Sequence, residues 1–249
     1  GILQAVCASG AAKDIKDEYI LEIEGIIKER PEKMVNPDLE TGKVELEVKC
    51  LKVLSESEIL PFDLKDISNL SLPVLLDFRP LTLRDEKTKS IFKIEEAVIN
   101  SFRTTMSDLG FTEFQAPTIV PVATEGGAEV FHIDYYNKDA YLAQSPQLYK
   151  QIMVGVFERV YTVAHAYRAE PSITTRHIAE YISLDAEMGF INSWEDLMDI
   201  CEIIIRNMFF LLRQNYQKEL KMTGGTIPKL GPKIPIIKMR KAQEIIFER

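Results

Sequence analysis

Residues 167–187 read YRAEPSITTRHIAEYISLDAE, and this stretch predicts a β-hairpin. One strand ends in an Arg and a Glu, the connecting loop carries an Arg and a His, and the return strand carries an aromatic residue and two carboxylates. The residues of the hairpin that are candidates for a functional role are Arg168, Glu170, Arg176, His177, Tyr181 and Asp185.

The side chains of this hairpin suit a nucleotide. A guanidinium fixed on a strand can bind a phosphate through two parallel hydrogen bonds, which an ammonium cannot do, so Arg168 is a candidate phosphate ligand. Tyr181 on the return strand can offer its face to a base. Taken alone, however, the charges of the two strands are more typical of the solvated face of an exposed sheet.

Upstream of the hairpin, residues 143–151 read AQSPQLYKQ and predict the start of a helix. Ser145 is a suitable N-cap, and Pro146 suits the first helical position. Gln147 and Lys150 then lie three residues apart on one helical face, where an amide and an ammonium together can receive a small carboxylate. The alternative is a capped surface helix with a solvated lysine, the more common situation for this residue type.

Farther upstream, residues 124–131 read TEGGAEVF. The two adjacent glycines predict a mobile loop, and Glu125 and Glu129 flank them. Such a loop can close over a ligand. A plain hairpin turn is the alternative, and without further context it is favoured.

The rest of the chain predicts an α+β fold. Alternating apolar residues indicate strands at 18–27 and 43–49, and a helix is expected over 87–109, ending at Gly110, with its apolar stripe on Ile91, Ile94, Val98, Phe102 and Met106. Short strands then alternate with loops. A second long helix is expected to begin at Ser193, with Asp196 three residues on as a partial capping box, and to run to about residue 220; a short helix is expected near 242–249. Segregated strands and helices favour a small β domain followed by an α+β domain.

Composition sets broader limits. Charged residues make up 27% of the chain and hydrophobic residues 46%, which is typical of a globular domain rather than of a disordered chain. The net charge of −8 gives no support to nucleic-acid binding at the level of bulk charge. Three scattered cysteines predict neither a disulfide framework nor a zinc site and favour a cytoplasmic location. No apolar run is long enough for a membrane span, so no membrane partner is expected.

Taken together, these motifs resemble one family, the aspartyl-tRNA synthetases of class II. LGFTEFQAP, residues 109–117, resembles class II motif 1 with Pro117 as its proline, and the hairpin resembles motif 2. TEGGAE resembles the flipping loop of the family, and QSPQLYKQ resembles its amino-acid-binding segment. RPEKMVNPDLETGKVELEV, residues 30–48, resembles the last strands of its OB-fold anticodon-binding domain. Four motifs in the family's order carry the resemblance.

The resemblance implies a domain organisation. Residues 1–63 are expected to be the C-terminal strands of an OB-fold β-barrel, residues 64–87 a hinge, and residues 88–249 the N-terminal part of an antiparallel-sheet catalytic domain with flanking helices. The glycine-rich motif 3 is not found before Arg249. The chain is therefore expected to be a partial one with little or no ligase activity of its own and no metal ligands.

The resemblance also implies roles for individual residues, with ATP and Mg²⁺ as cofactors. Arg168 would hold the α-phosphate and act in catalysis, and Tyr181 would stack on adenine. Glu170 would face the adenine and the end of the tRNA, while Arg176 and His177 would contact the triphosphate or the acceptor end. The residues implied to bind aspartate are Lys150 at the side-chain carboxylate, Gln147 and Asp185 at the α-ammonium group, with Ser145 nearby and Glu125 in the lid.

The implied reaction is the activation of aspartate and its transfer to tRNA(Asp), and the sequence leaves open whether tRNA(Asn) is also charged. A homodimer is implied, with Pro117 at its interface. An asparaginyl enzyme is the nearest alternative, but Lys150 answers a carboxylate better than an amide. A lysyl enzyme, a non-catalytic synthetase-like protein and a tRNA-independent amino-acid ligase are less favoured alternatives.

Overall fold

A computed structural model describes residues 1–7, 12–37, 39–123, 129–171, 174 and 177–248. The chain divides into two compact units, residues 1–70 and residues 71–249. The division falls inside the segment 64–87, for which the sequence predicts a hinge. That segment contains three short helices that its irregular periodicity does not predict: η2 (Leu64–Asn69), α1 (Leu72–Asp77) and α2 (Arg79–Thr82).

The first unit is a three-stranded sheet in the order β1-β3-β2. The long strands β2 (Ile20–Glu29) and β3 (Val44–Ser55) pair antiparallel, and the short β1 (Ala5–Val6) pairs parallel to β3. The 3₁₀ helix η1 (Glu32–Met34) lies in the β2–β3 connection. The predicted strands are therefore confirmed, but the described residues form an open sheet and no closed barrel.

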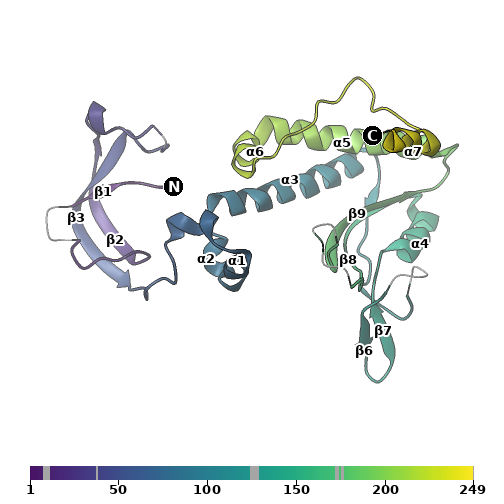
Figure 1. The fold of residues 1–249 in the computed structure, drawn as a ribbon, viewed down its shortest axis with the longest axis horizontal. Coiled ribbons are helices and arrows are strands. Elements are labelled where there is room, and N and C mark those ends of the chain that lie inside the picture. The colour runs from purple at the N-terminus through teal and green to yellow at the C-terminus, as the bar shows by residue number, and fades with distance from the viewer. Residues whose placement is uncertain (8–11, 38, 124–128, 172–173, 175–176, 249) are drawn as a thin grey trace. The chain divides into compact units, whose positions relative to one another are not determined.

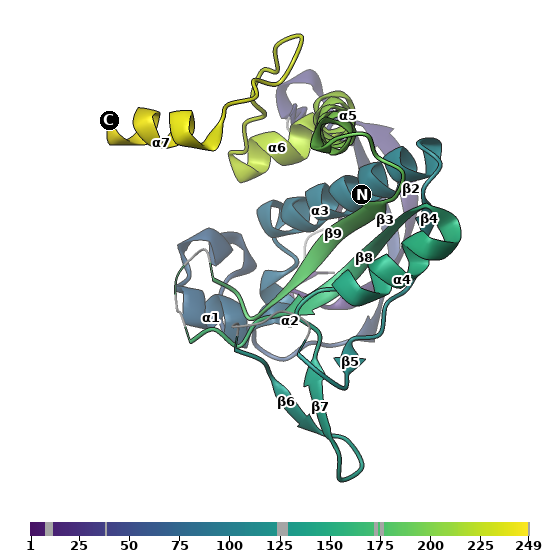
Figure 2. The same ribbon diagram turned by 90° about the vertical axis from the view of Figure 1, so that its right-hand side faces the viewer.

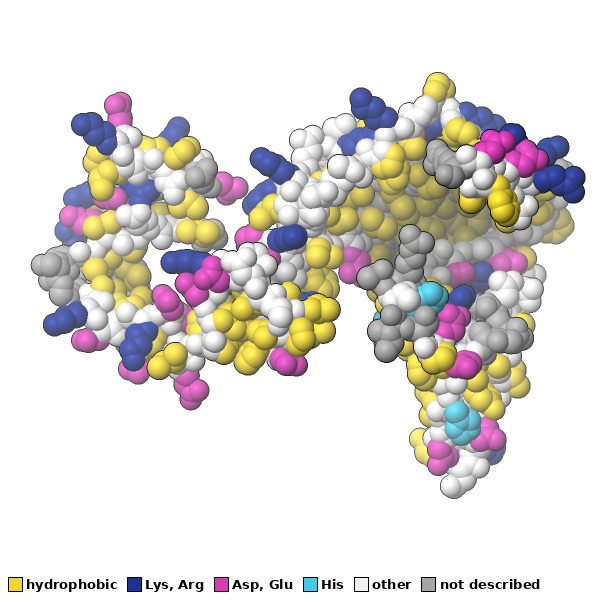
Figure 3. Space-filling view, viewed as in Figure 1, with side chains coloured by type: hydrophobic (Ala, Val, Ile, Leu, Met, Phe, Trp, Pro, Cys, Tyr) yellow, Lys and Arg dark blue, Asp and Glu magenta, His cyan; other side chains and the backbone are white. Residues whose placement is uncertain are grey.

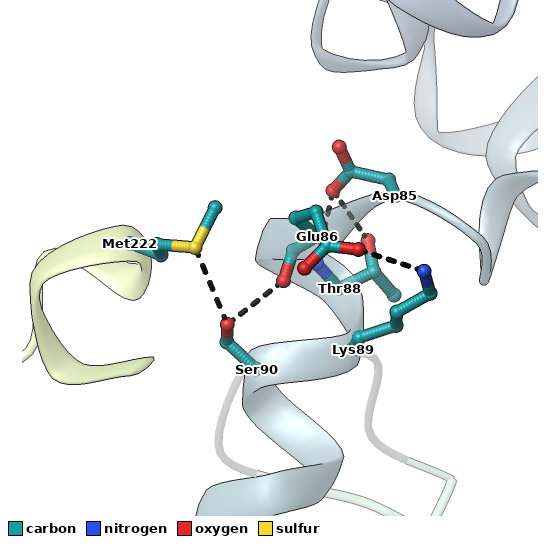
Figure 4. A network of polar contacts seen from close by, with 6 residues as sticks. All are labelled: Asp85, Glu86, Thr88, Lys89, Ser90 and Met222. Atoms are coloured by element: carbon teal, nitrogen blue, oxygen red, sulfur yellow. Dashed lines mark hydrogen bonds and ion pairs between the residues drawn. The ribbon is translucent and has the colours of Figure 1, made fainter. Parts of the chain in front are cut away.

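The second unit begins its main body with α3 (Glu86–Asp108), close to the predicted span. Asp85 caps the helix by accepting a hydrogen bond from the backbone N–H of Thr88 at 2.9 Å (Figure 4). The hydroxyl of Ser90 lies 3.7 Å from the sulfur of Met222, so a distant helix packs on this first turn. The predicted apolar stripe is right at Phe102 and Met106 and wrong at Ile91, which is 53% exposed.

The core of the second unit lies between helices and a sheet in the order β4-β8-β9. Strands β8 (Arg159–Tyr167) and β9 (Glu180–Met188) form the predicted antiparallel hairpin, and β4 (Thr112–Glu113) adds to β8 in parallel. Phe102 and Met106 of α3 pack with Phe111 and Tyr161, and residues of α5 complete the cluster. Figures 1 and 2 show α3 and α5 on one side of this hairpin and α4 on the other.

Residues 119–157 form the remaining part of the site-bearing region. Strands β5 (Ile119–Val120), β6 (His132–Asp134) and β7 (Asp139–Leu142) form an antiparallel sheet in the order β5-β7-β6. The β6–β7 hairpin extends away from the rest of the second unit in Figure 1. Helix α4 (Gln147–Phe157) follows and packs against both β8 and β9.

The C-terminal helices differ from the prediction in one respect. Ser193 and Asp196 form a capping box at the start of α5 (Trp194–Asn215), where the sequence indicates a partial one, but the helix ends at Asn215, with Tyr216 as its C-cap, instead of running on to residue 220. A separate helix, α6 (Gln217–Thr223), follows and ends at Gly224, whose positive φ of 71° suits glycine. An extended segment then leads to α7 (Met239–Phe247).

Apolar side chains also remain at the surface of the second unit. Figure 3 shows hydrophobic side chains gathered over the α1–α2 segment, where Leu72 and Leu76 are exposed.

None of the helices in the described ranges combines the length and the apolar character needed to cross a lipid bilayer.

Candidate active site

The two faces of the β8–β9 hairpin have different environments. Val163, Leu184, Ala186 and Met188 pack on the helical core, so the alternate residues face the other way. Residues paired directly across an antiparallel sheet share a face. The register pairs Thr162 with Asp185, Ala164 with Ser183 and Ala166 with Tyr181. We call this second face, made by residues 162, 164, 166, 181, 183, 185 and 187, the site face; α4 packs against its strands.

Lys150 of α4 contributes a buried positive charge to the site face. The residue is only 6% exposed. Its Nζ lies 2.8 Å from Oδ1 of Asp185 and 3.7 Å from Oε2 of Glu187. A buried ammonium is stable only when it is paired and hydrogen-bonded, and the two carboxylates meet that condition. The alternative of a solvated lysine on a surface helix is therefore wrong.

The two carboxylates of β9 are likewise not ordinary surface charges. The side chains of Asp185 and Glu187 are 18% and 30% exposed. Asp185 accepts a second hydrogen bond, from the hydroxyl of Ser183. The alternating charges of this strand thus belong to a partly desolvated cluster, and the solvated-face interpretation fails for Asp185.

The start of α4 differs slightly from the prediction. Pro146 is the N-cap residue, with φ −80° and ψ 15°, and the helix begins at Gln147. Ser145 is therefore not the N-cap, although its hydroxyl accepts a hydrogen bond from the backbone N–H of Gln147 at 3.3 Å. Gln147 and Lys150 remain one turn apart, as the sequence predicts, because the helix continues regularly through both.

The other end of the site face carries Arg168 and Tyr181. The guanidinium carbon of Arg168 lies 5.9 Å from the centre of the Tyr181 ring, within the range of a cation–π contact. The backbone N–H of Arg168 donates to the carbonyl of Ala179 at 2.9 Å, which extends the hairpin beyond β8. Its Nε is buried and has no hydrogen-bond partner among the described residues. A buried donor in this condition is available to an anion.

The two ends of the site face are separated by a distance that suits an extended ligand. Tyr181 and Asp185 are four residues apart on one face of β9, and at about 3.3 Å per residue this corresponds to about 13 Å. The residues opposite them on β8 include Ala164 and Ala166, whose side chains are methyl groups. The arrangement places a guanidinium and an aromatic ring at one end and a paired ammonium at the other.

The remaining predicted residues lie around this face or outside the described residues. Glu170 is exposed just beyond β8, next to Ala169, whose N–H donates to the carbonyl of Glu129 at 3.1 Å. Nδ1 of His177 lies 2.7 Å from the hydroxyl of Thr174. Pro117 is exposed between β4 and β5. Glu125 and Arg176 lie outside the described residues, so their predicted roles stay untested.

Sequence reasoning assigned no role to Ser183, Glu187 or the pair formed by His165 and Glu180. Nδ1 of His165 lies 3.0 Å from Oε1 of Glu180, on the opposite face of the hairpin. Burial, followed by the charge of Glu180, raises the pKa of Tyr167 beside this pair. The two-residue period of β9 is the signal that identifies Ser183 and Glu187, because both share the face of Asp185. No group of three His, Cys, Asp or Glu side chains suited to a metal occurs within the described part of the chain.

Comparisons with known proteins find similar sequences along the whole chain. A family model described as tRNA synthetases class II (D, K and N) matches residues 71–248. An aspartate–tRNA(Asp/Asn) ligase of Deinococcus radiodurans is 39% identical over 251 residues, which cover 100% of this chain and 56% of that protein. An aspartate–tRNA(Asp) ligase of Pyrococcus abyssi is 36% identical over 236 residues, covering 94% of this chain and 52% of that protein. The chain thus spans about half the length of these relatives.

Solved structures show the same similarity. Asparaginyl-tRNA synthetase of Pyrococcus horikoshii, in complex with asparaginyl-adenylate, matches with a TM-score of 0.85 and 29% identity, covering 100% of this chain and 58% of that chain. Aspartyl tRNA synthetase of Entamoeba histolytica matches with a TM-score of 0.79 and 25% identity, covering 99% of this chain and 54% of that chain.

Proposed function

Because the chain belongs to the class II tRNA synthetases of the aspartate, lysine and asparagine group, we propose that it supplies the ATP- and aspartate-binding face of an aspartate–tRNA ligase. Relatives that are 35–39% identical and named as aspartate–tRNA ligases support the choice of amino acid. Within the chain, one observation carries the proposal. The buried ammonium of Lys150 lies against the site face of the β8–β9 hairpin, the face that also carries Arg168 and Tyr181.

The Lys150 end of the site face suits a dicarboxylic amino acid. Aspartate brings one ammonium group and a side-chain carboxylate, and the site offers one ammonium group and two carboxylates. We infer that Lys150 pairs with the side-chain carboxylate of the substrate and that Asp185, with Gln147 and Ser145 nearby, receives its α-ammonium group. Asp185 and Glu187 continue to hold Lys150, so the ammonium stays paired with carboxylates of the protein while Asp185 offers its remaining acceptor positions to the substrate.

The Arg168 end suits ATP. The Nε of Arg168 has no hydrogen-bond partner in the described ranges, which supports its assignment to the α-phosphate, and Tyr181 supplies an aromatic face for adenine. When bound, Mg²⁺ neutralises phosphate charge, and a hard cation of this kind prefers oxygen ligands. Because the described residues include no three-ligand acidic or His/Cys cluster, we assign no residue of this chain to the metal.

The proposed reaction has two steps. The α-carboxylate of aspartate attacks the α-phosphorus of ATP, the bond to the leaving phosphate breaks, and pyrophosphate departs. The terminal ribose hydroxyl of tRNA then attacks the carbonyl carbon of the adenylate and releases AMP. Arg168 stabilises negative charge that develops on the phosphorus oxygens, and Lys150 and Asp185 hold the amino acid in line. Catalysis rests on positioning and electrostatics, without a covalent enzyme intermediate.

Further parts of the proposal rest on the family resemblance. Glu170 and His177 would contact the adenine, the triphosphate or the tRNA end, as would Arg176, and Glu125 would close over aspartate. The sheet of β1, β2 and β3 would belong to an OB-fold that binds the anticodon of tRNA(Asp), and of tRNA(Asn) if the enzyme is non-discriminating. Pro117 would lie at the interface of a cytoplasmic homodimer.

An asparaginyl enzyme is a second candidate because the match to the asparaginyl-tRNA synthetase of Pyrococcus horikoshii has a TM-score of 0.85. The two candidates predict different substrates. An asparagine side chain carries no charge, so it would leave the Lys150 ammonium with the carboxylates of the protein. An aspartate side chain gives that ammonium a third carboxylate partner.

Exchange of pyrophosphate into ATP tests the proposal, and it is measured in the full-length protein to which this chain belongs. We expect exchange with aspartate and, at equal concentration, at least about tenfold less with asparagine or lysine, since one charge-assisted contact accounts for about a tenfold difference. Lys150→Met should raise the KM for aspartate, whereas Lys93→Met, which changes an exposed lysine of α3, should not. A preference for asparagine would support the second candidate, and the absence of exchange with any amino acid would favour a non-catalytic protein.

A further inference from the structure

Ser183 lies midway between the two ends of the site face. It precedes Asp185 and follows Tyr181 by two residues on β9, so about 7 Å of strand separates it from each. In the proposed reaction, the amino acid lies at the Asp185 end and the nucleotide at the Tyr181 end. The reacting α-carboxylate and α-phosphate would therefore meet above Ser183.

The hydroxyl of Ser183 acts on Asp185. It donates a hydrogen bond to Oδ2 of that carboxylate, while Lys150 donates to Oδ1 at 2.8 Å. The two donors approach different oxygens and therefore fix the rotation of the carboxylate plane. Each oxygen of an ionised carboxylate can accept a second hydrogen bond, so one acceptor position per oxygen remains for a ligand.

Directly opposite Ser183, strand β8 carries no hydroxyl, and the Thr162 hydroxyl opposite Asp185 makes no hydrogen bond within the described part of the chain. Ala164 is its direct partner on β8, and Ala166 is the next residue on the same face. Both side chains are methyl groups that cannot donate a hydrogen bond. A substitution that removes the Ser183 hydroxyl would therefore release Oδ2 of Asp185 from its bond with β9, while the backbone ladder between the strands stays intact.

Resting on the proposed function, we propose that Ser183 is a positioning residue for the amino acid. Its hydroxyl holds the Asp185 carboxylate in the orientation that presents the remaining acceptor positions to the α-ammonium group of aspartate. The residue does not contact the phosphates in this role. Its removal should therefore affect aspartate more than ATP.

The test compares Ser183→Ala and Ser183→Thr in the full-length protein, with Ser107→Ala as a matched control on the exposed surface of α3. Aspartate-dependent exchange of pyrophosphate into ATP gives the KM for both substrates and kcat. For Ser183→Ala we expect the KM for aspartate to rise about tenfold, the size typical of one hydrogen bond to a charged group, with kcat and the KM for ATP changed less than about twofold. Ser183→Thr keeps a hydroxyl and should restore most of the affinity.

Each outcome bears on the inference. An unchanged KM for aspartate in Ser183→Ala would overturn it, as would an equal rise in the KM for ATP, which would indicate general distortion of the sheet. A Ser183→Thr variant as impaired as Ser183→Ala would also overturn it. If the unsubstituted protein shows no aspartate-dependent exchange, the proposed function fails and this inference fails with it; normal exchange combined with an insensitive Ser183 removes the inference alone.

Discussion

Lys150 places a positive charge where little water reaches it. The buried ammonium is stabilised by its two acidic neighbours. Its side chain is 8% exposed, and those of Asp185 and Glu187 are 18% and 30% exposed. Replacing the ammonium leaves two partly desolvated carboxylates without a counter-charge. We expect Lys150→Met to lower the free energy of unfolding by roughly 2–3 kcal/mol, which is less than for a fully buried pair because both carboxylates keep some contact with water. Chemical denaturation measures this difference.

Lys93→Met is the control for that measurement. Lys93 pairs with Glu96 at 2.8 Å, but its side chain is 62% exposed, so its removal should change the unfolding free energy by less than about 1 kcal/mol. Adding Asp185→Asn to Lys150→Met should recover part of the loss, since it removes one uncompensated charge. If Lys150→Met lowers the free energy of unfolding no more than Lys93→Met does, the ion pairs of Lys150 do not contribute to the stability of the protein.

Sequence patterns singled out most residues of the candidate site face but did not give their contacts. Arg168 and Tyr181 are predicted from one hairpin, and the hairpin register brings them together. The contact between Lys150 and Asp185 joins segments 35 residues apart, and it depends on how α4 packs against the sheet. Local periodicity does not encode that packing. Ser183 and Glu187 were predictable in principle, because strand parity places them on the face of Asp185.

Among the elements, the extended segment after α6 depends on side chains of α5. Arg206 donates from Nη2 to the carbonyls of Gly231 and Pro232 at 2.8 and 2.9 Å. Glu202 accepts from Arg206 and, at 3.3 Å, from the backbone N–H of Ile234. The hydrogen bond from Arg206, with further help from Ile234, lowers the pKa of Glu202 below its usual value. One carboxylate therefore links the helix to the segment.

This linkage predicts a pH dependence. Because the folded protein lowers the pKa of Glu202, the link stabilises the segment above the unfolded pKa of about 4.3 and is lost as the pH falls through the lower folded value. Hydrogen exchange of residues 226–238, corrected for the intrinsic rate, should show protection at neutral pH that declines below about pH 4. In Glu202→Gln the protection should be weaker at neutral pH and nearly independent of pH across this window. A wild-type profile unchanged by the substitution would contradict the assignment.

Two glycines give a matched pair of backbone tests. Gly25 lies beside an irregularity in the β2–β3 register, and a Cβ there would collide with the backbone carbonyl of Glu47. Gly155 lies inside α4 with open space around the position of a Cβ. Gly25→Ala should therefore destabilise the protein. Gly155→Ala should stabilise it by about 0.5–1 kcal/mol, the usual difference between these residues in a helix. Thermal unfolding measures the change in Tm of each variant. Equal shifts of Tm with the same sign would contradict the expected difference between the two positions.

The long elements were predictable because each combines a periodic pattern with a terminal signal. Asp85 and Gly110 bracket α3, and Ser193 with Asp196 starts α5. The break at Tyr216 was missed, since the apolar pattern continues across it. The short helices within residues 64–82 were missed for the opposite reason, because four to six residues cannot establish a period. The parallel pairing of β4 with β8 comes from chain topology, which a two-residue strand does not signal.

At the scale of the whole molecule, the two units differ in how much apolar surface they bury. Of the hydrophobic side chains that the structure describes as buried, Ile67 alone belongs to residues 1–70, and the others, including Phe102, Met106 and Tyr161, belong to residues 71–249. The sequence predicts the two long strands of the first unit, β2 and β3, but not the short β1. It leaves open whether these strands form a small sheet or part of a barrel, because alternation along a strand gives the facing of each residue but not the number of strands that pair beside it.

This difference predicts separate folding behaviour. Hydrophobic burial is the main favourable contribution to folding, and a small sheet with little covered surface is marginal in water. Residues 71–249 produced alone should keep their helical circular dichroism and unfold in one cooperative transition near that of the whole chain. Residues 1–70 alone should show no cooperative transition. A cooperative transition for residues 1–70 alone would contradict the prediction by showing that this unit is stable without the second one. Loss of structure in isolated residues 71–249 would contradict it by showing that the second unit depends on the first.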